Sequence, residues 1–400
     1  MKKIILSFIA LSTLALTSCS SDDDNNSTDP VIVDPTDPVD NFAKVVADID
    51  LDGVVAPDTY DFIREGATTV SYSGQTTRIA MADELTNNHF KDENTSLTEL
   101  NNMFALGTGF NDVLLTGKKI REKTGSSVDF FDGNSENVQI KAYFDDLITD
   151  QVDNVFTNWS ATASAGNPGQ IADGSNTRYI NAKGIENNQI FAKGLIGAMQ
   201  VDQALNSYMT RIETANNDTS SLGAGEYTDM EHFFDEAYGY LLNPNDGSFF
   251  GKYLPKVASN SNFSEVQTEI EQAFRIARQA IVDQKYDVRN QAIEVLRYQV
   301  STVVAVRTIH YLQAGKNALT LGNQGTACHD LSEGIGFLYS LRFTRKSNVK
   351  ETYFSKSEID GFLSDIEAGN GLWDITSATL DSICEDIAAK FDFTVEQAAL

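Results

Sequence analysis

The chain has 400 residues, and its 57 acidic side chains outnumber 30 basic ones to give a formal net charge of −27. Such an acidic surface argues against nucleic acid and anionic lipid headgroups as partners. The composition suits a water-exposed globular protein that attracts cations, and its length is sufficient for one large or two smaller helical domains.

Residues 1–18 have the pattern of an export signal. Two lysines precede an apolar run from Ile4 to Leu16, and small residues lead to Cys19. The run is too short to span a bilayer comfortably. Residues 16–19, Leu-Thr-Ser-Cys, resemble the bacterial lipobox, which implies cleavage before Cys19 and lipidation of that residue. We therefore expect attachment to a membrane through lipid at Cys19, and loss of the two lysines would take the net charge to −29.

Residues 19–41 predict a disordered acidic tether. The segment is rich in aspartate, contains three of the seven prolines and has too little apolar material to fold. Acidic residues directly after the lipidated cysteine resemble the surface-export signal of Bacteroidota lipoproteins. We expect a protein that is lipid-anchored to the outer membrane and faces either the periplasm or the outside of the cell.

Residues 42–400 are expected to be mainly α-helical, as one helical domain or as two helix groups, 42–182 and 183–400. Alternating apolar residues on both sides of Glu65-Gly66 predict a short N-terminal β-hairpin within residues 57–74. Helical periodicity then follows from residue 75, with Pro- and Gly-rich residues 160–177 expected as a loop. The clearest helices are predicted over residues 138–159, 183–215, 263–281, 287–315, 356–367 and 375–391.

One pattern occurs twice in the second half of the chain. Residues 232–241 (HFFDEAYGYL) and 329–338 (HDLSEGIGFL) both give His, three residues, Glu, two residues, Gly, an aromatic residue and Leu. The pattern uses two of the four histidines in the chain. On a helix, His and Glu at this spacing share a face, and the following Gly lets another helix or a ligand come close.

Three interpretations of this pattern stay open. The leading one is structural: each pair forms a satisfied polar contact inside a helical bundle. Alternatively, two such helices packed antiparallel would bring their imidazoles and carboxylates together as a site for iron, zinc or haem, or for a different ligand. The candidate metal ligands are His232, Glu236, His329 and Glu333. The candidate ligand-binding set adds Asp235 and, as a weaker member, Glu186.

Two cysteines remain after Cys19. In an oxidising envelope Cys328 and Cys384 could form one disulfide, or both could be unpaired buried thiols. His310 falls on the apolar face of its predicted helix, where a lone histidine is usually a satisfied core residue, although it could also complete a cluster with His232 and His329.

Several stretches together resemble a lipoprotein family of Bacteroidota known as domain of unknown function 4856 and related to the imelysin-like proteins. They are residues 68–81 (TTVSYSGQTTRIAM), 183–199 (KGIENNQIFAKGLIGAM), 230–241 (MEHFFDEAYGYL) and 328–343 (CHDLSEGIGFLYSLRF). The resemblance implies a mainly helical, imelysin-like bundle and genomic association with iron- or haem-uptake systems. The chain departs from the imelysin G-x-H-x-x-E motif, because His329 and Glu333 are four apart and no Gly lies two before the His.

These observations favour a non-enzymatic envelope lipoprotein that binds a ligand or partner in iron or haem acquisition. No zinc-protease motif, nucleophile elbow, P-loop or dinucleotide fingerprint occurs in the sequence. One alternative is a metal-dependent hydrolase of the imelysin type, with Glu236 or Glu333 as general base. Another is a scaffold for a neighbouring outer-membrane transporter, which would show an exposed apolar patch.

Overall fold

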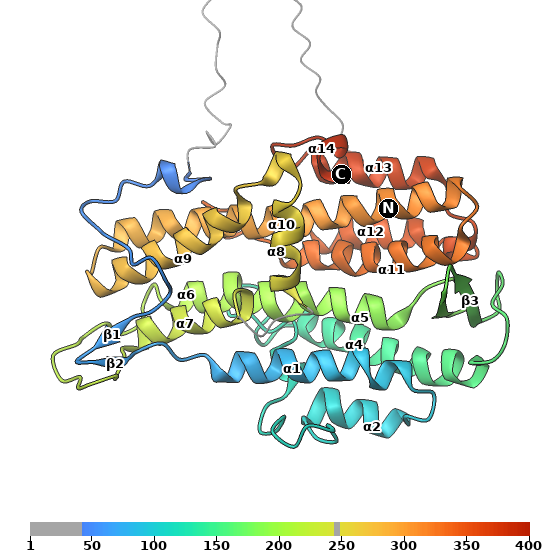
Figure 1. Cartoon of the computed structure of the whole chain (residues 1–400), viewed down its shortest axis with the longest axis horizontal. Helices are drawn as coiled ribbons and strands as arrows, with labels where there is room; N and C mark the ends of the chain where they lie inside the picture. Colours follow the sequence, from blue (N-terminus) through green and yellow to red (C-terminus); the bar gives the residue numbers. More distant parts are fainter. Residues whose placement is uncertain (1–41, 244–248) are drawn as a thin grey trace, which may run out of the picture. The chain divides into compact units, whose positions relative to one another are not determined.

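The computed structural model describes residues 42–243 and 249–400, so the predicted signal peptide, Cys19 and the tether lie outside the described residues. Phe42–Leu400 forms one compact unit. Its helices run mostly along one common direction, and α8 crosses them (Figure 1). Side chains from Ala43 to Ala398 contribute to one large hydrophobic core. Mainly helical structure was predicted, and the structure confirms it.

The first half of this unit contains shorter elements. The strands are β1 (Ile63–Arg64), β2 (Ala67–Thr68), β3 (Gly169–Asp173) and β4 (Asn176–Ile180). The helices are α1 (Ser73–Asn87), α2 (Leu97–Asn101), α3 (Ile120–Lys123) and α4 (Ser135–Asp150), with π-helical turns at Asn102–Leu106 and Gln151–Val155 and 3-10 turns at Val46–Asp48, His89–Lys91 and Phe156–Asn158.

The second half is built from longer helices. A continuous helical segment comprises α5 (Asn187–Leu195), π-helical turns Ile196–Val201 and Ala204–Tyr208, and α6 (Met209–Arg211). The remaining helices are α7 (Asp229–Leu241), α8 (Phe250–Ala258), α9 (Val266–Val282), α10 (Tyr286–Thr320), α11 (Gln324–Ser340), α12 (Lys356–Ile366), α13 (Ser377–Ala388) and α14 (Val395–Ala399), with 3-10 turns at Ser261–Phe263, Leu341–Phe343 and Gly371–Trp373.

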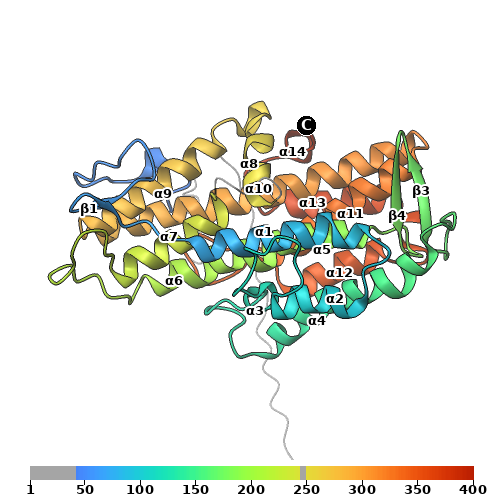
Figure 2. The same ribbon diagram turned by 60° about the horizontal axis from the view of Figure 1, so that its bottom comes forward.

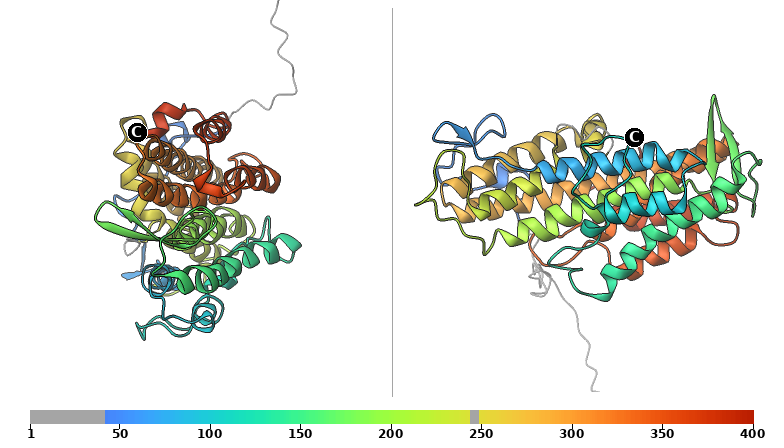
Figure 3. Two further views of the ribbon diagram at one scale, coloured as in Figure 1. Left: turned by 90° about the vertical axis from the view of Figure 1, so that its right-hand side faces the viewer. Right: turned by 90° about the horizontal axis from the view of Figure 1, so that it is seen from below.

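The helices form layers around the segment 187–211. Helices α1, α2 and α4 lie on one side of it, and α10, α11 and α13 lie on the other (Figure 3). Helix α11 packs against both α5 and α10, while α7 packs against α1, α9 and the π-turn Ala204–Tyr208. At Gly197 a side chain would collide with Ser340, whose Cα lies 2.4 Å from the Cβ position, so glycine permits this close crossing.

The two hairpins lie at opposite ends of the bundle (Figure 2). The predicted N-terminal hairpin is confirmed: β1 pairs with β2 around Glu65 and Gly66, whose φ angles of 51° and 86° fit a tight two-residue turn. The expectation of a loop over residues 160–177 is wrong in part. There β3 pairs with β4 around Gly174 and Ser175, and Asp-Gly-Ser-Asn supplies the hairpin turn. The strands were not predicted because most of their residues are polar.

Candidate functional site

The second copy of the His/Glu pattern lies on α11 and meets the start of α5. Glu186 precedes the first residue of α5, and its backbone N–H donates to Ser332 Oγ at 2.9 Å. This bond places its carboxylate against His329, with 2.5 Å between Glu186 Oε2 and His329 Nδ1. Glu186, the weaker sequence candidate, is therefore the direct partner of His329.

Glu333, on the same helix, is held by a lysine from α5. Lys193 Nζ lies 3.0 Å from Glu333 Oε1 and also donates to Gln189 Oε1 at 3.2 Å. Burial alone would raise the pKa of Glu333, but the charges of Lys193 and His329 outweigh it and bring that pKa to about 2. Glu333 is consequently a firmly ionised, paired carboxylate and a weak proton acceptor at neutral pH.

A small pocket lies beside Glu186. Its volume is about 210 Å³, and its walls include Glu186, Lys91, Asn188 and the rings of Trp159 and Tyr179. The two rings stack with centroids 3.4 Å apart. Burial lowers the pKa of Lys91, although the nearby carboxylate of Glu186 opposes that shift. The pocket thus combines a carboxylate, an amine, amides and an aromatic wall, which suits a small polar ligand.

The first copy of the pattern lies on α7, and its Asp235 has a structural role. Asp235 Oδ1 accepts hydrogen bonds from Arg278 Nε at 2.9 Å and from the Tyr60 hydroxyl at 2.8 Å. Arg278 is fully buried and also bonds Glu231 Oε1 at 3.1 Å. Burial raises the pKa of Asp235 despite the adjacent guanidinium. This network joins α7, α9 and the N-terminal hairpin region inside the core.

His232 and Glu236, unlike the core residue Asp235, face a cavity. Glu236 Oε1 accepts from Gln75 Nε2 at 2.9 Å and from the Tyr208 hydroxyl at 3.4 Å. The His232 ring stacks on Tyr227 with centroids 4.6 Å apart. Both side chains line a cavity of about 350 Å³ at the first turn of α1. The Gly in each copy of the pattern lies at a close contact, as the sequence predicted.

The structure does not bring the two His/Glu pairs together. Helix α11 packs mainly on α5 and α10, whereas α7 packs on α1, α9 and the π-turn Ala204–Tyr208. The third histidine considered, His310, bonds the carbonyl of Leu400 at 3.2 Å. Among residues 42–243 and 249–400, no group of three or more His, Cys, Asp or Glu side chains is placed to hold a metal ion. His329 and Glu333 have separate partners, Glu186 and Lys193, and the described residues form neither the mutual His–Glu contact favoured from the sequence nor the alternative shared site for iron, zinc or haem.

The two remaining cysteines are not joined. Cys328 and Cys384 are both free and buried, which resolves the alternative left open by the sequence in favour of separate thiols. Burial raises the pKa of each thiol to about 11. Such thiols stay protonated at neutral pH and are poor nucleophiles.

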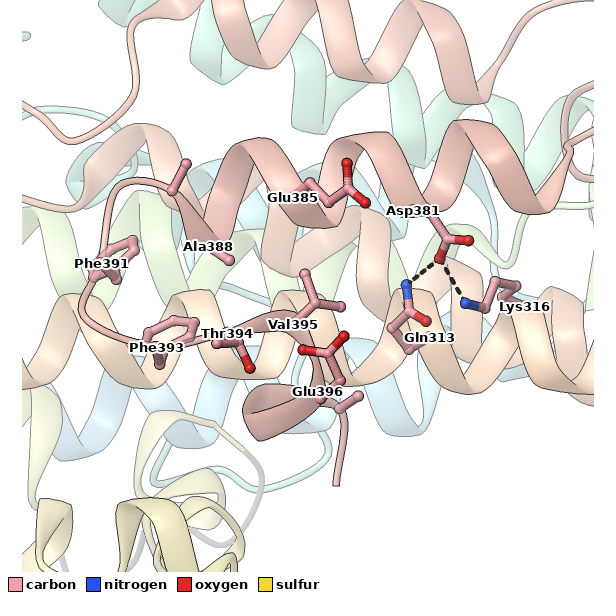
Figure 4. A pocket seen from close by; sticks show the side chains of 12 residues that line it. Gln313, Lys316, Asp381, Glu385, Ala388, Phe391, Phe393, Thr394, Val395 and Glu396 are labelled. Carbon is pink, nitrogen blue, oxygen red and sulfur yellow. Dashed lines mark hydrogen bonds and ion pairs between the residues drawn. The ribbon is translucent and has the colours of Figure 1, made fainter.

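A groove with a volume of about 720 Å³ lies among α10, α13 and α14 (Figure 4). Asp381 accepts hydrogen bonds from Gln313 Nε2 at 2.9 Å and Lys316 Nζ at 2.6 Å. Figure 4 shows Phe391 and Phe393 toward the other end of the groove. The groove contains none of the residues predicted from sequence, and its lysine is already paired.

The cations near the two copies of the pattern were not predicted from the sequence. Lys193 was detectable in principle, because it lies seven residues after Glu186 on a helix that is otherwise predicted as apolar. Arg78, Lys118 and Lys123 offered no such signal, since they come from separate segments that only the fold unites.

Among the described helices, none combines the length and apolar character needed to cross a membrane. Searches of curated proteins and of solved structures found no match. The family described as Domain of unknown function (DUF4856) matches residues 57–394. This range includes both copies of the His/Glu pattern, the pocket beside Glu186 and the cavity at the first turn of α1. The chain belongs to this family.

Proposed function

We propose that the protein is a non-enzymatic, lipid-anchored binding protein of the outer membrane that holds a small polar ligand beside Glu186. The observation that carries this proposal is the pocket whose Glu186 carboxylate is fixed by His329 at 2.5 Å. A carboxylate held in place, together with amides and an aromatic wall, favours selective binding because little side-chain entropy is lost when the ligand enters.

Binding has more support than hydrolysis. A hydrolase of the imelysin type would need metal ligands and a free carboxylate base, whereas Glu333 is paired with Lys193 and has a pKa of about 2. Glu236 accepts two hydrogen bonds from neutral donors and lies on a different helix. Within residues 42–243 and 249–400, no three His, Cys, Asp or Glu side chains are grouped to hold a metal ion.

The cellular setting of the proposal rests on the sequence. The lipobox-like residues 16–19 support lipidation at Cys19, and the acidic tether supports export toward the cell surface. The resemblance to Bacteroidota lipoproteins supports a role in iron or haem uptake, with an outer-membrane transporter as the candidate partner.

The ligand can be tested by denaturing the purified native lipoprotein and measuring released small molecules by mass spectrometry, with iron and haem quantified in parallel. We expect a stoichiometric small molecule in the wild type that is lost in Glu186→Gln. Glu385→Gln, which changes the same charge on α13, is the control and should retain it. Equal amounts of every released molecule in the wild type and Glu186→Gln would contradict the proposal.

The anchor is tested separately by cell fractionation and metabolic labelling with a fatty-acid analogue. We expect the wild type to carry the label in the outer-membrane fraction and Cys19→Ser to lose it. A labelled Cys19→Ser protein, or an unlabelled wild type, would contradict lipidation at this residue.

A further inference from the structure

The cavity at the first turn of α1 gathers positive charge in an acidic protein. Its volume is about 350 Å³, and it is lined by three cationic side chains and by two carboxylates, Glu122 and Glu236. Arg78 comes from α1, Lys118 from the loop before α3, and Lys123 from the end of α3. Two separate segments, α1 and residues 118–123, therefore deliver cations to one cavity, although the whole chain has a net charge of −27.

These three cations lack the ion pairs that some other basic residues make in the fold. Arg121, on α3, pairs with Asp145, and Lys193, on α5, pairs with Glu333. Within the part of the chain that the structure describes, none of Arg78, Lys118 and Lys123 forms an ion pair with a carboxylate. Three unpaired cations that line one cavity beside only two carboxylates favour a counter-charge supplied from outside the protein.

Arg78 gives the strongest support for an external anion among the three cations, because its side chain is buried. The residue is only 8% exposed, and its guanidinium bonds backbone carbonyls: Nε donates to Lys119 at 3.3 Å and Nη1 to Gly74 at 3.4 Å. These bonds fix the position of the group without neutralising its charge. A guanidinium held in this way is suited to charge-assisted hydrogen bonds with an anion.

The cations converge on the N-terminus of α1. A Cβ built on Gly74 would lie 3.3 Å from Lys118 Nζ and 3.5 Å from Arg78 Nη1, so both groups reach the first helical turn. The side chain of Tyr72 does not cap this 15-residue helix. Exposed amides at the start of a helix add partial positive charge to the same place.

The carboxylates at the cavity have other roles or positions. Glu236 is held by Gln75 and Tyr208, as described above, and Glu122 is exposed. Burial lowers the pKa of Lys123, and the charges of Arg78 and Arg211 lower it further. Positive charge is therefore under-compensated here. His232 adds a ring nitrogen, Nδ1, that is buried and has no partner among the described residues.

We propose that this cavity binds a small oxyanion, a phosphate or carboxylate group carried by a soluble ligand, between Arg78, Lys118, Lys123 and the first turn of α1. Arg78 supplies a fork of N–H donors, the two lysines supply movable charge, and His232 Nδ1 is the additional polar contact at the wall. The site is separate from the pocket beside Glu186 and does not depend on it.

The test is isothermal titration of the full mature chain with inorganic phosphate and, separately, with citrate. Low ionic strength is used because salt screens the attraction, and chloride at matched ionic strength is the blank. The variants are Lys118→Gln and Lys123→Gln. Lys119→Gln is the matched control, because it removes one positive charge next to Lys118 but does not line the cavity.

We expect at least one anion to bind, with affinity reduced about tenfold or more in Lys118→Gln and Lys123→Gln and nearly unchanged in Lys119→Gln. Binding of phosphate alone identifies a phosphorylated ligand, and binding of citrate alone identifies a carboxylate ligand. Absence of binding of either anion at millimolar concentration would overturn the proposal. So would an equal loss of affinity in Lys119→Gln, because that result indicates only nonspecific attraction.

Discussion

Helices α7 and α11 carry the same ten-residue pattern but surround its His and Glu with different chemistry. On α11, Glu333 is paired with Lys193 and His329 with Glu186. On α7, Glu236 is held by neutral donors, and the cations near it are unpaired. The shared pattern therefore specifies how a helix packs, while residues from other segments decide whether its charges are neutralised within the protein.

The largest expected effect comes from breaking the neutralised pair on α11. Lys193→Met should destabilise the protein by about 3–5 kcal/mol, because it leaves the Glu333 carboxylate buried without its cation. Urea unfolding monitored by circular dichroism measures the change. A loss below about 1 kcal/mol, which is the contribution of an exposed ion pair, would show that solvent compensates Glu333 and that the α11 site is open.

Asp202 lies on the segment 187–211, which contacts both α7 and α11. It is a buried carboxylate without a cation, so its effect on stability depends on pH. Burial raises its pKa to about 6, since its partners are the Ser126 and Ser127 amides and Asn206 rather than a cation. The folded state thus holds this proton more tightly than the unfolded state. Its stabilising contribution is complete below about pH 4 and is lost as pH rises through about 6, a change of roughly 3 kcal/mol.

This pH dependence is measured as the difference in unfolding free energy between the wild type and Asp202→Asn. We expect the unfolding free energy of the wild type to fall relative to that of the variant between pH 4 and 7, by up to about 3 kcal/mol. The comparison with one variant cancels the contributions of the other carboxylates. A difference that stays constant over this range would mean that Asp202 is ionised at its ordinary pKa.

Gly239 and Gly336, the glycines of the repeated pattern, test whether both helices need a close contact at this position. A Cβ at Gly336 would lie 2.5 Å from Lys193 Cβ, and one at Gly239 would lie 2.4 Å from Tyr72 Cβ. Neither neighbouring atom can move without its backbone, so each Gly→Ala change should cost about 1–3 kcal/mol. Gly361→Ala on α12 is the control: nothing lies within 4 Å of its Cβ position, and we expect a gain of about 0.4–1 kcal/mol.

The smallest effect is expected from the unpaired lysine near α7. Lys123→Met should change stability by less than about 0.5 kcal/mol or increase it, because burial and two neighbouring cations already penalise its charge. Thermal unfolding at neutral pH measures this. A loss as large as that of Lys193→Met would reveal an unrecognised internal partner for Lys123 and remove the contrast between the helices.

The helices and the close contacts at glycine could be predicted from the sequence, because both depend on local periodicity. It placed α9, α10, α12 and α13 correctly to within a few residues, and it predicted why Gly239 and Gly336 are glycine. It could not predict that the two copies of the pattern lie apart, because helix packing is set by contacts between distant segments. For the same reason it missed Lys193 as the partner of Glu333 and Arg78 as a cavity residue.

The separation of the two His/Glu pairs is tested most directly by a double-mutant cycle of His232→Ala and His329→Ala. Unfolding free energies are measured without metal and with Zn²⁺ or Fe³⁺. Separate sites predict that the two changes add to within about 0.5 kcal/mol in every condition. A coupling energy above about 1 kcal/mol that appears only with metal would show that His232 and His329 share one ion, contrary to the structure described here.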